Sequence, residues 1–409
     1  MGAGPSGLLL GLRLAKENID VTLLDLGPSV DQRPRATHYS PPASLELEKA
    51  GILEDVWKRG FIPGGIEWRK LDLTPIAAVP GLPEELRTPD KGLLCLPLNF
   101  LGTVMMEHLA KYPSAKILWS HEVIGIEEGE DQATVIAKTT EGEKRYTGDH
   151  VVGCDGANSK IRRSLFGDWN FPGFTWEEQI VATNVSPTLA PPIRLIQVYY
   201  DFPKHGVVDG QFVVHPEHWH MVARISKDGM YRVSYGEPTG LSHEEVPSQV
   251  SVLIKLIARQ PMKYEVMLPG HPKPGDYKLT NCMPYKIHQR CAEKFKVGRF
   301  LIAADAAHLC NPFGGMGLTG GLVDAGNLAD CLIGIKKGLT DDTILDRWDE
   351  VRREKWHSII NPVSSANIRR LNTLNPDTAV DNDDFFKLLK SAEKDPSLLK
   401  SMADASPFI

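Results

Sequence analysis

The feature that most constrains this chain is its opening, MGAGPSGLLLGLRLAKENIDVTLLD, where Gly2, Gly4 and Gly7 form a G-x-G-x-x-G motif. The next residues have the apolar spacing of a helix, and VTLLD reads as a strand that ends on Asp25. Such glycines permit a tight turn, close approach of a pyrophosphate and close helix–strand packing. The carboxylate of Asp25 can accept hydrogen bonds from a ribose. The pattern favours part of a nucleotide-binding β-α-β unit, although a plain glycine-rich turn has the same letters.

The strand that normally precedes this motif is missing, because only Met1 stands before Gly2. Burial of one large apolar side chain contributes about 1.5 to 3 kcal/mol. Four or five such losses rival the roughly 5 to 15 kcal/mol that holds a domain folded. We therefore expect the native chain to begin upstream of Met1 with an apolar strand, and the same gap leaves room for a short targeting signal.

Composition narrows the class of protein. A chain of 409 residues with 42% hydrophobic and 24% charged residues can bury large cores in two or three domains. A net charge of −6 offers no basic field for nucleic acid, and no apolar run of about 18 residues could span a bilayer. The 6 cysteines form no C-x-x-C pair, which favours reduced thiols, no metal and a cytoplasmic location. A small-molecule ligand is expected.

Periodicity and turn residues predict the layout of the chain. Helices are expected at residues 44–60, 101–111, 244–259 and 317–335. The proline-rich residues 71–92 look like an excursion of the chain from the main fold. In residues 116–156 apolar and polar residues alternate between turn signals, as they do in a β-meander. Residues 193–236 read as antiparallel strands with a turn at 227–229, and residues 298–305 as a buried strand that ends in a polar turn.

These patterns predict an α/β fold in which the first and last parts of the chain form one layer around a β-rich insertion. We expect a discontinuous Rossmann-like domain with a β-meander, an inserted β-rich α+β substrate domain and a short helical C-terminus. The boundaries follow in that order: 1–70, 93–172 and 285–362 for the first domain, 71–92 and 173–284 for the second, and 363–409 for the tail.

Two further motifs follow the first in the chain. GCDGANSKIRR spans residues 153–163 at the end of the meander, and GRFLIAADAAHLCNPFGGMGLTGG spans residues 298–321. In the latter, Asp305 leaves a strand and glycines precede a helix, whose start offers free N–H groups to an anionic ligand edge. Each motif also has a purely structural interpretation, with Asp305 as a helix cap and Asp155 as a turn residue.

With three motifs in this order, residues 1–362 resemble the single-component flavin-dependent aromatic hydroxylases of the para-hydroxybenzoate hydroxylase type. The resemblance implies that Asp305 holds the ribityl chain of FAD and that Asp155 and Gly156 serve both FAD and NADPH. It places Arg35 at the ribose and pyrophosphate, and Asn99 where many members carry a glutamine that touches the flavin. The residues implied along the flavin ring are Pro312, Gly314, Gly315, Met316, Gly317 and Leu318.

Two positions depart from the family pattern. Asp25 stands where the family usually has Glu, and Ala304 stands where it usually has Gly. Both changes are conservative, although a methyl group at residue 304 is tolerable only if the backbone there keeps a negative φ.

The resemblance implies an FAD- and NAD(P)H-dependent monooxygenase that hydroxylates a phenolic or polyketide-like aromatic substrate with O2 through a C4a-hydroperoxyflavin. NADPH is expected as a transient co-substrate, since no second complete G-x-G-x-x-G follows the first. Two alternatives stay open. One is a noncatalytic or damaged relative that has lost FAD with its first strand, and the other is an FAD-dependent epoxidase or Baeyer-Villiger-type monooxygenase. A homodimer is also left open.

A phenol reacts better as its phenolate, so a base or a hydrogen-bond relay is expected in the β-rich part. The candidates there are Tyr199, Tyr200, His215, His220 and Arg232. The sequence does not say which face of the sheet meets the flavin, and most of the aromatic residues also suit a core. The segment HPEHWH suggests a metal site, but no carboxylate or cysteine completes it by spacing, so we expect no metal.

Overall fold

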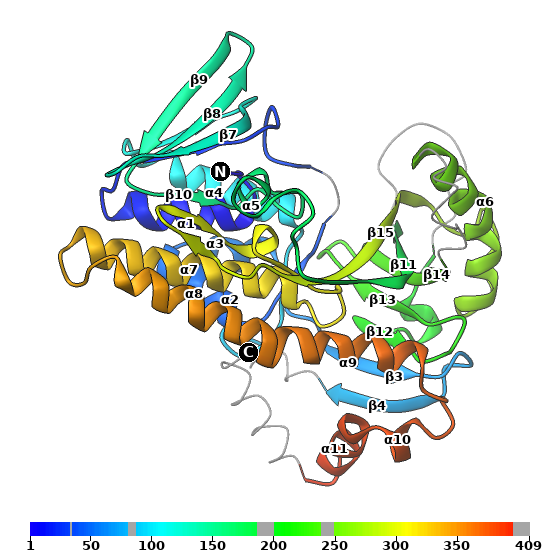
Figure 1. Ribbon diagram of the computed structural model, residues 1–409. Helices are drawn as coiled ribbons and strands as arrows, with labels where there is room; N and C mark the ends of the chain where they lie inside the picture. Colours follow the sequence, from blue (N-terminus) through cyan, green and yellow to red (C-terminus); the bar gives the residue numbers. More distant parts are fainter. Residues whose placement is uncertain (33–34, 81–86, 186–199, 239–248, 396–409) are drawn as a thin grey trace.

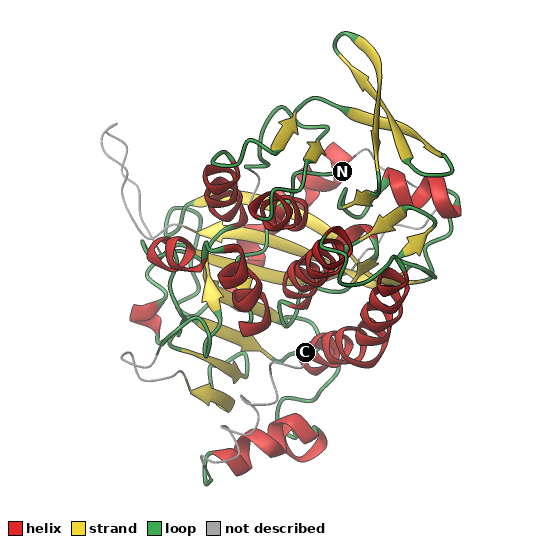
Figure 2. Cartoon of the chain, turned by 90° about the vertical axis from the view of Figure 1, so that its left-hand side faces the viewer, coloured by secondary structure: helices red, strands yellow, loops and turns green. Residues whose placement is uncertain are grey.

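The computed structural model describes residues 1–32, 35–80, 87–185, 200–238 and 249–395. Two parts lie side by side (Figure 1): a layer of helices and short parallel strands that contains the N-terminus, and a large sheet with helix α6 on its outer side. Seen from the side in Figure 2, helices lie in front of the strands of the large sheet. This is the mixed α/β architecture predicted from the sequence.

The first layer rests on two pairs of parallel strands. β1 (Val21–Leu24) pairs with β6 (Ala115–Leu118), and β10 (Val151–Gly153) pairs with β17 (Phe300–Ile302). A short strand, β16 (Lys296–Val297), extends the second pair, and β2 (His38–Tyr39) pairs with β5 (Leu94–Cys95) nearby.

Met1 and Gly2 join the two parallel pairs. The amino group of Met1 donates to the Val152 carbonyl at 2.7 Å, and the Met1 carbonyl accepts from Cys154 N at 2.7 Å. On the other side, Gly2 N donates to the Leu24 carbonyl at 2.8 Å. The first glycine motif therefore begins where the two pairs meet.

Helices enclose this layer. α1 (Pro5–Lys16) is its central helix, with residues 6–15 all buried, and it packs against α4 (Leu98–Leu109) and α7 (Met316–Lys336). The other helices of this part are α2 (Pro41–Ala50), α3 (Leu53–Arg59), α5 (Lys160–Phe166) and α8 (Thr343–Lys355). Within the described ranges, α7 is long and apolar enough to cross a membrane, and half of that stretch is buried in the protein, as in a core helix.

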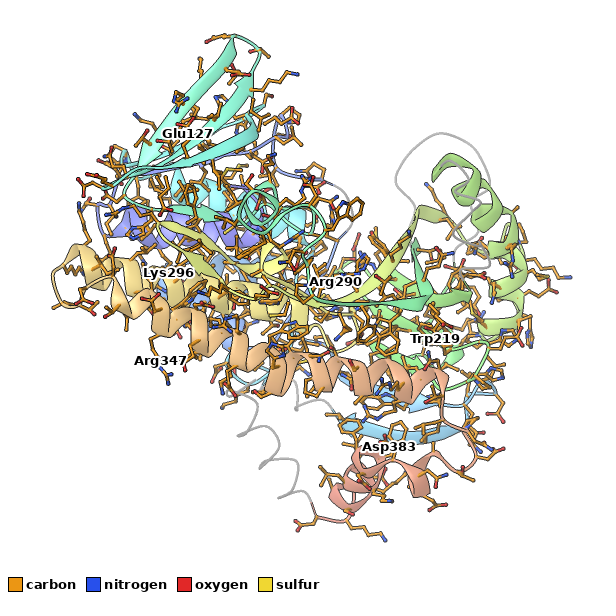
Figure 3. All side chains as sticks on the ribbon, in the orientation of Figure 1. Glu127, Trp219, Arg290, Lys296, Arg347 and Asp383 are labelled. Carbon is orange, nitrogen blue, oxygen red and sulfur yellow. The ribbon has the colours of Figure 1, made fainter. Side chains whose placement is uncertain are left out.

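The predicted β-meander is a three-stranded antiparallel sheet that projects from the rest of the molecule. It consists of β7 (Glu122–Glu128), β8 (Ala133–Thr139) and β9 (Gly142–Gly148). Glu127 marks this sheet in Figure 3. Arg299 ties it to the layer, because its backbone N–H donates to the Glu128 carboxylate at 2.9 Å.

The large sheet has eight strands in the order β18-β15-β11-β14-β13-β12-β3-β4. Their bounds are β3 (Gly65–Arg69), β4 (Pro75–Pro80), β11 (Gly173–Val185), β12 (Gly210–Val213), β13 (His220–Arg224), β14 (Tyr231–Pro238), β15 (Leu279–Cys291) and β18 (His308–Leu309). All neighbouring pairs are antiparallel except β12 with β3. The domain boundary expected at residue 70 thus falls inside the β3–β4 pair.

Helix α6 (Gln249–Met267) covers one face of this sheet, over a core that includes Tyr264 and Met267. The last helices are α9 (Asn361–Asn372), α10 (Ala379–Asn382) and α11 (Asp384–Ala392), and a π-helical turn (Trp356–Ile360) joins α8 to α9. α11 packs on β4, and its Phe385 and Phe386 meet Trp68 of the neighbouring strand β3 edge-on at 5.3 and 5.9 Å between ring centroids. Asp383, labelled in Figure 3, binds Arg370 at 2.9 Å and fixes this helical tail to α9.

Three details of the sequence prediction were wrong. The helix expected at 44–60 is two helices, because Gly51 adopts a left-handed φ of 77° and ends α2. The helix expected at 244–259 runs on through Pro261 to Met267, since its second half buries apolar residues against the sheet, and its expected first residues, 244–248, lie outside the described residues. The proline-rich segment contributes strand β4 to the edge of the large sheet. The first of the strands expected at 193–236 lies partly outside the described residues.

Candidate active site

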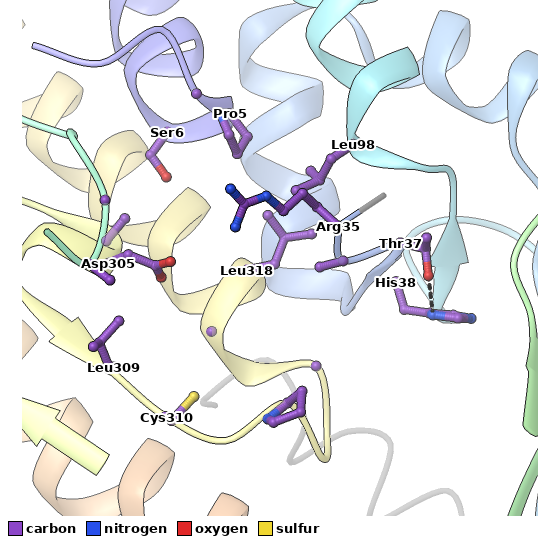
Figure 4. Close-up of a pocket in the computed structure, with 18 of the residues that line it drawn as sticks. Pro5, Ser6, Arg35, Thr37, His38, Leu98, Asp305, Leu309, Cys310 and Leu318 are labelled. Atoms are coloured by element: carbon purple, nitrogen blue, oxygen red, sulfur yellow. Dashed lines mark hydrogen bonds between the residues drawn. The ribbon is translucent and has the colours of Figure 1, made fainter. Parts of the chain in front are cut away.

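A cavity of about 2630 Å3 lies between the α/β layer and the large sheet. Pockets for a single small ligand usually measure about 300 to 1,000 Å3. Residues of all three motifs line the cavity, together with one face of the large sheet. Figure 4 shows Arg35, Asp305 and Leu318 projecting into it from three different segments. The cavity therefore has room for a large cofactor and a separate small ligand.

At the first motif, the glycines have distinct surroundings. No atom lies within 4 Å of where a Cβ of Gly4 would stand, and Gly4 faces the cavity. A Cβ on Gly7 would stand 1.9 Å from the Gly2 carbonyl oxygen, so Gly7 allows α1 to pack closely. The first turn of α1 has no side-chain cap. Its free N–H groups and the open glycine suit a pyrophosphate.

Asp25 stands beside this turn at the end of β1. Its carboxylate accepts from Ala3 N at 2.6 Å and from Gly27 N at 2.7 Å, and it lines the cavity. These two bonds fix the carboxylate in place. Carboxylate oxygens can accept further hydrogen bonds, so Asp25 is suited to ribose hydroxyl groups.

At the third motif, Asp305 lies on a short 3-10 turn, η3 (Ala304–Ala306), directly after β17. Its side chain opens into the cavity, which is itself deep in the protein. Burial there raises the pKa of Asp305 above its ordinary value, although His308 and Arg35 act in the opposite direction. Further on, Gly314 and Gly315 have φ values of 105° and 66°, and they turn the chain into the uncapped start of α7.

The condition set above for a methyl group at residue 304, a negative φ, is not met. The φ of Ala304 is +56°, in the left-handed region that side chains rarely adopt. Helix α7 compensates in two ways. Gly321 leaves space for the methyl group of Ala304, and the Asp324 carboxylate accepts from Ala304 N at 3.1 Å.

The second motif is linked to the third by buried hydrogen bonds. Asp155 accepts from Lys160 N at 2.7 Å and from Ile161 N at 3.3 Å, which secures the start of α5. Arg162 donates to the carbonyls of Ala306 at 3.0 Å and Ala157 at 2.7 Å. The segment around Gly156 is therefore held at the cavity wall by its contact with η3.

Most of the cofactor residues predicted from the sequence line this cavity. They are Gly2, Gly4, Asp25, Arg35, Asp155, Gly156, Asp305, Pro312, Gly314, Gly315, Gly317 and Leu318. Gly7, Asn99 and Met316 do not. Gly7 packs α1 onto Gly2, Met316 is buried beside Gly314, and Asn99 is half-buried on α4, where its neighbour Leu98 lines the cavity.

The large sheet presents one face to the cavity, and strand register defines that face. One row across β4, β3, β12, β13 and β14 consists of Val79, Ile66, Gly210, Ala223 and Arg232. The next row consists of Trp68, Phe212, Met221, Ser234 and Ala182. All of these residues line the cavity, as do the paired Ile180 and Tyr285. The wall is mostly apolar, with Arg232, Ser234 and Tyr285 among its polar groups.

The catalytic candidates are placed very differently. Arg232 lines the cavity, and its Nη1 donates to the Arg35 carbonyl at 2.6 Å. Tyr200 is buried in the core under the opposite face of the sheet. His220 also lies on that face, where it pairs with Tyr235, and burial lowers its pKa to about 4. Tyr199 lies outside the described residues.

His215 is a further candidate that the structure places away from the cavity. It lies in the loop between β12 and β13, where its Nδ1 accepts from Glu217 N at 3.1 Å and from His218 N at 2.9 Å. Its ring stacks on His218 with centroids 5.0 Å apart. Trp219, labelled in Figure 3, is buried in the same hairpin. The histidine-rich segment shapes this hairpin, and we withdraw Tyr200, His215 and His220 as catalytic candidates.

Sequence reasoning missed His38, Ser234 and Tyr285. Burial, with the nearby Arg232 charge, lowers the pKa of His38 to about 4, and its Nδ1 lies 2.8 Å from Thr37 Oγ1 (Figure 4). Ser234 is two residues from Arg232, so strand alternation could have placed it on the same face. No sequence signal marked Tyr285 or His38, which enter the site from β15 and from the short strand β2.

The three motifs and an apolar face of the large sheet meet at one cavity, which suits a flavin-dependent oxygenase of the aromatic hydroxylase class. The chain belongs to the FAD binding domain family, whose model matches residues 1–361. The protein is thus an FAD-dependent aromatic monooxygenase, as the sequence predicted. No relative decides the individual site residues.

Three relatives illustrate this similarity. The chain is 33% identical over 387 residues to para-nitrophenol 4-monooxygenase from Pseudomonas sp. (strain WBC-3), covering 95% of this chain and 90% of the relative. It is 28% identical over 416 residues to 6-hydroxy-3-succinoylpyridine 3-monooxygenase from Pseudomonas putida (strain DSM 28022 / S16), covering 100% and 96%. The crystal structure of p-nitrophenol 4-monooxygenase from Pseudomonas putida DLL-E4 superposes with a TM-score of 0.87 at 32% identity, covering 100% and 96%.

Proposed function

We propose that this protein hydroxylates a small phenol that binds as its phenolate, with FAD as cofactor, O2 as co-substrate and NAD(P)H as reductant. The observation that carries the proposal is the cavity face of the large sheet, where Arg232 ends a row of small and apolar residues. The names of the two similar monooxygenases both specify an aromatic ring with a hydroxyl group. Such a substrate fits an apolar wall with a cation at one end.

The phenolate is the form of the substrate that reacts with an electrophilic oxygen, because its ring is richer in electrons. Burial lowers the pKa of Arg232, but a guanidinium keeps its proton at neutral pH. A guanidinium next to the phenol oxygen lowers the pKa of the phenol and favours the phenolate. The hydroxyl groups of Ser234 and Tyr285 stand on the same wall and can donate to the same oxygen. We assign these three residues to substrate ionisation and orientation.

The residues at the other end of the cavity fit FAD. In this proposal Gly4 and the start of α1 hold the pyrophosphate together with Arg35, Asp25 holds the ribose, and Asp305 holds the ribityl chain. The segment at Gly314 lies along the flavin ring. Bound FAD supplies the redox chemistry that activates O2 at the expense of NAD(P)H. The polypeptide orients the substrate, keeps water from the reacting atoms and stabilises the phenolate.

Other predictions remain proposals of the same kind. We propose that Asp155 and Gly156 also contact the transiently bound NAD(P)H, that the protein is cytoplasmic, and that it can form a homodimer. We also propose the division into an FAD-binding domain and a β-rich substrate domain. Because β3 pairs within the large sheet, residues 65–80 belong with the substrate domain in this division.

The test uses holoenzyme with 4-nitrophenol and, as a neutral comparison, 4-nitroanisole, in which a methyl group blocks ionisation. We expect NAD(P)H oxidation with 4-nitrophenol and an oxygenated product identified by mass, but no product from 4-nitroanisole. NAD(P)H oxidation that yields only hydrogen peroxide across a panel of phenols would reject the hydroxylase assignment. A purified protein without FAD would instead support the alternative of a noncatalytic relative.

The role of Arg232 needs a matched variant. Arg232→Met removes the cation at the cavity wall, whereas Arg259→Met removes an exposed cation on α6, behind the opposite face of the sheet, where Arg259 lies 3.4 Å from Glu237. We expect Arg232→Met to raise the KM for 4-nitrophenol at least about tenfold, or 1.4 kcal/mol, and to shift the pH optimum of the reaction to higher pH. Arg259→Met should leave the KM within a factor of about three. An unchanged KM in Arg232→Met would contradict the assignment.

A further inference from the structure

A buried ion cluster lies directly behind Asp305 and is not part of the cavity wall. Its centre is Asp324 on α7, which is fully buried. One carboxylate oxygen accepts from Arg352 Nε at 2.6 Å, and the other lies 2.6 Å from His308 Nε2. The second oxygen also accepts from Ala304 N at 3.1 Å. Asp324 thus joins a buried arginine and a histidine to the backbone just before Asp305.

The residue that Asp324 holds has an unusual conformation. Ala304 has a φ of +56°, and alanine avoids this left-handed region because its Cβ approaches the following carbonyl oxygen. Asp305 follows immediately, so the backbone torsions at residue 304 decide where the Asp305 carboxylate points. If residue 304 relaxed to a negative φ, the chain after β17 would leave in another direction and Asp305 would not face the cavity in the same way.

Helix α7 also makes space for this conformation. A Cβ on Gly321 would stand 2.7 Å from the Ala304 Cβ, closer than real Cβ atoms approach one another. Gly321 and Asp324 are three residues apart, so both lie on the same face of α7. One turn of this helix therefore admits the methyl group of Ala304 and binds its N–H.

We propose that Asp324 and Gly321 are positioning residues for FAD: together they hold Ala304 in the left-handed conformation and thereby aim the Asp305 carboxylate at the cofactor. Neither residue lines the cavity, so neither contacts FAD itself. The proposal rests on the role assigned above to Asp305. It goes beyond that role, because it makes the affinity for FAD depend on the backbone conformation at residue 304.

The first test is a double-mutant cycle between Asp324→Asn and Ala304→Gly, with the dissociation constant for FAD measured on apoprotein by flavin fluorescence. An asparagine side chain can accept at one end only, so it cannot serve both Arg352 and Ala304 as the carboxylate does. We expect Asp324→Asn to weaken FAD binding at least about tenfold. Glycine reaches a positive φ without the clash, so Ala304→Gly should restore most of the affinity in the Asp324→Asn background.

Gly321→Ala is the second variant, and it leaves the ion cluster intact. Its new methyl group would press on the Ala304 Cβ, and Ala304→Gly removes that obstacle. The methyl group would also stand 3.1 Å from Ser6 Oγ, which lies at the end of a side chain that can rotate away. We expect FAD affinity to fall at least about fivefold in Gly321→Ala and to return in Gly321→Ala/Ala304→Gly. Two controls on the same helix are Asp330→Asn, which loses its bonds to Arg13 and Lys49, and Gly334→Ala, and both should keep wild-type affinity.

Recovery of FAD affinity on adding Ala304→Gly distinguishes a positioning role of Asp324 and Gly321 from a general loss of stability. If Asp324 only stabilised the core, glycine at residue 304 would not repair the binding of FAD. Failure of Ala304→Gly to restore affinity in the Gly321→Ala background would overturn the proposal, even if Asp324→Asn did not fold. Asp305→Ala tests the underlying role separately: normal FAD binding in that variant would reject the role of Asp305, whatever the outcome of the two cycles.

Discussion

Alanine substitutions at Gly4, Gly7 and Gly11, in and directly before α1, can distinguish an effect on packing from an effect on cofactor binding. At Gly7, a Cβ would stand 1.9 Å from the Gly2 carbonyl oxygen, a backbone atom, so the helix must move outward by about 1 Å. At Gly11, the nearest atom is the Leu23 Cδ1 at 2.9 Å, on a side chain that can rotate. Gly4 has open space and an extended φ of −74°.

The magnitudes follow from these contacts. Alanine gains about 0.8 to 1 kcal/mol over glycine inside a helix, equally at residues 7 and 11. Overpacking against a rigid neighbour costs about 1 to 3 kcal/mol. Gly7→Ala should therefore unfold about 1 to 3 kcal/mol more easily than Gly11→Ala. Gly4→Ala should stay within about 1 kcal/mol of the wild type as apoprotein. Its methyl group would fill the space for the pyrophosphate, so its affinity for FAD should fall at least about tenfold.

The assay combines urea unfolding of the three apoproteins with titration of each by FAD. Gly11→Ala is the control, because it changes the same helix without a backbone obstacle. If Gly7→Ala were as stable as Gly11→Ala, the close approach of α1 to Gly2 would not constrain the fold. If Gly4→Ala bound FAD with wild-type affinity, the pyrophosphate would lie elsewhere and the cofactor assignment at the first motif would fail.

Asp305→Ala should purify as folded but colourless protein, because the carboxylate serves FAD rather than the core; a normal ratio of flavin to protein absorbance would contradict this. Burial opposes ionisation of Asp324, but His308 and Arg352 hold its pKa well below the ordinary value. This stabilisation is complete above the unfolded pKa of about 3.9 and is lost as pH falls toward the folded pKa. The free energy of unfolding should thus fall more steeply on acidification in wild type than in Asp324→Asn. Burial raises the pKa of Cys310 to about 12, so iodoacetamide should react slowly with this cavity thiol at pH 8, and more slowly still with FAD bound, as measured by peptide mass.

The sequence predicted which motif residues would gather at one end of the cavity, because that end is built from local motifs. In the second and third motifs the acidic residue and the glycines lie within about ten residues of one another, and in the first motif Asp25 follows Gly7 by 18 residues. The motifs also lie at the ends of strands that pair in one layer, so their relative placement follows from the fold class. Asn99 shows the limit of this approach, because it does not line the cavity, whereas its neighbour Leu98 on α4 does.

The substrate end could not be predicted in the same way, because its wall is one face of a sheet assembled from distant strands. Alternation along β14 separates Arg232 and Ser234 from Tyr231 and Tyr235, but it does not say which set meets the flavin. Helix α6 determines which set faces the cavity, because it packs on the opposite face of the sheet through its own residue Tyr264. Without the packing of that helix, Arg232 and Tyr200 were equal candidates.

Ala304 shows how tertiary structure can reverse a local rule. Judged alone, alanine in place of glycine predicts a negative φ at that position, since the left-handed region costs alanine about 1 to 2 kcal/mol. The structure shows a φ of +56°, and the compensation comes from Gly321 and Asp324, which no window around residue 304 includes. A hydrogen bond to a buried carboxylate contributes about 1.5 to 3 kcal/mol, enough to offset that strain. The conformation at Ala304 is thus a property of the contact between η3 and α7, and substitutions on α7 should change it as strongly as substitutions at Ala304 itself.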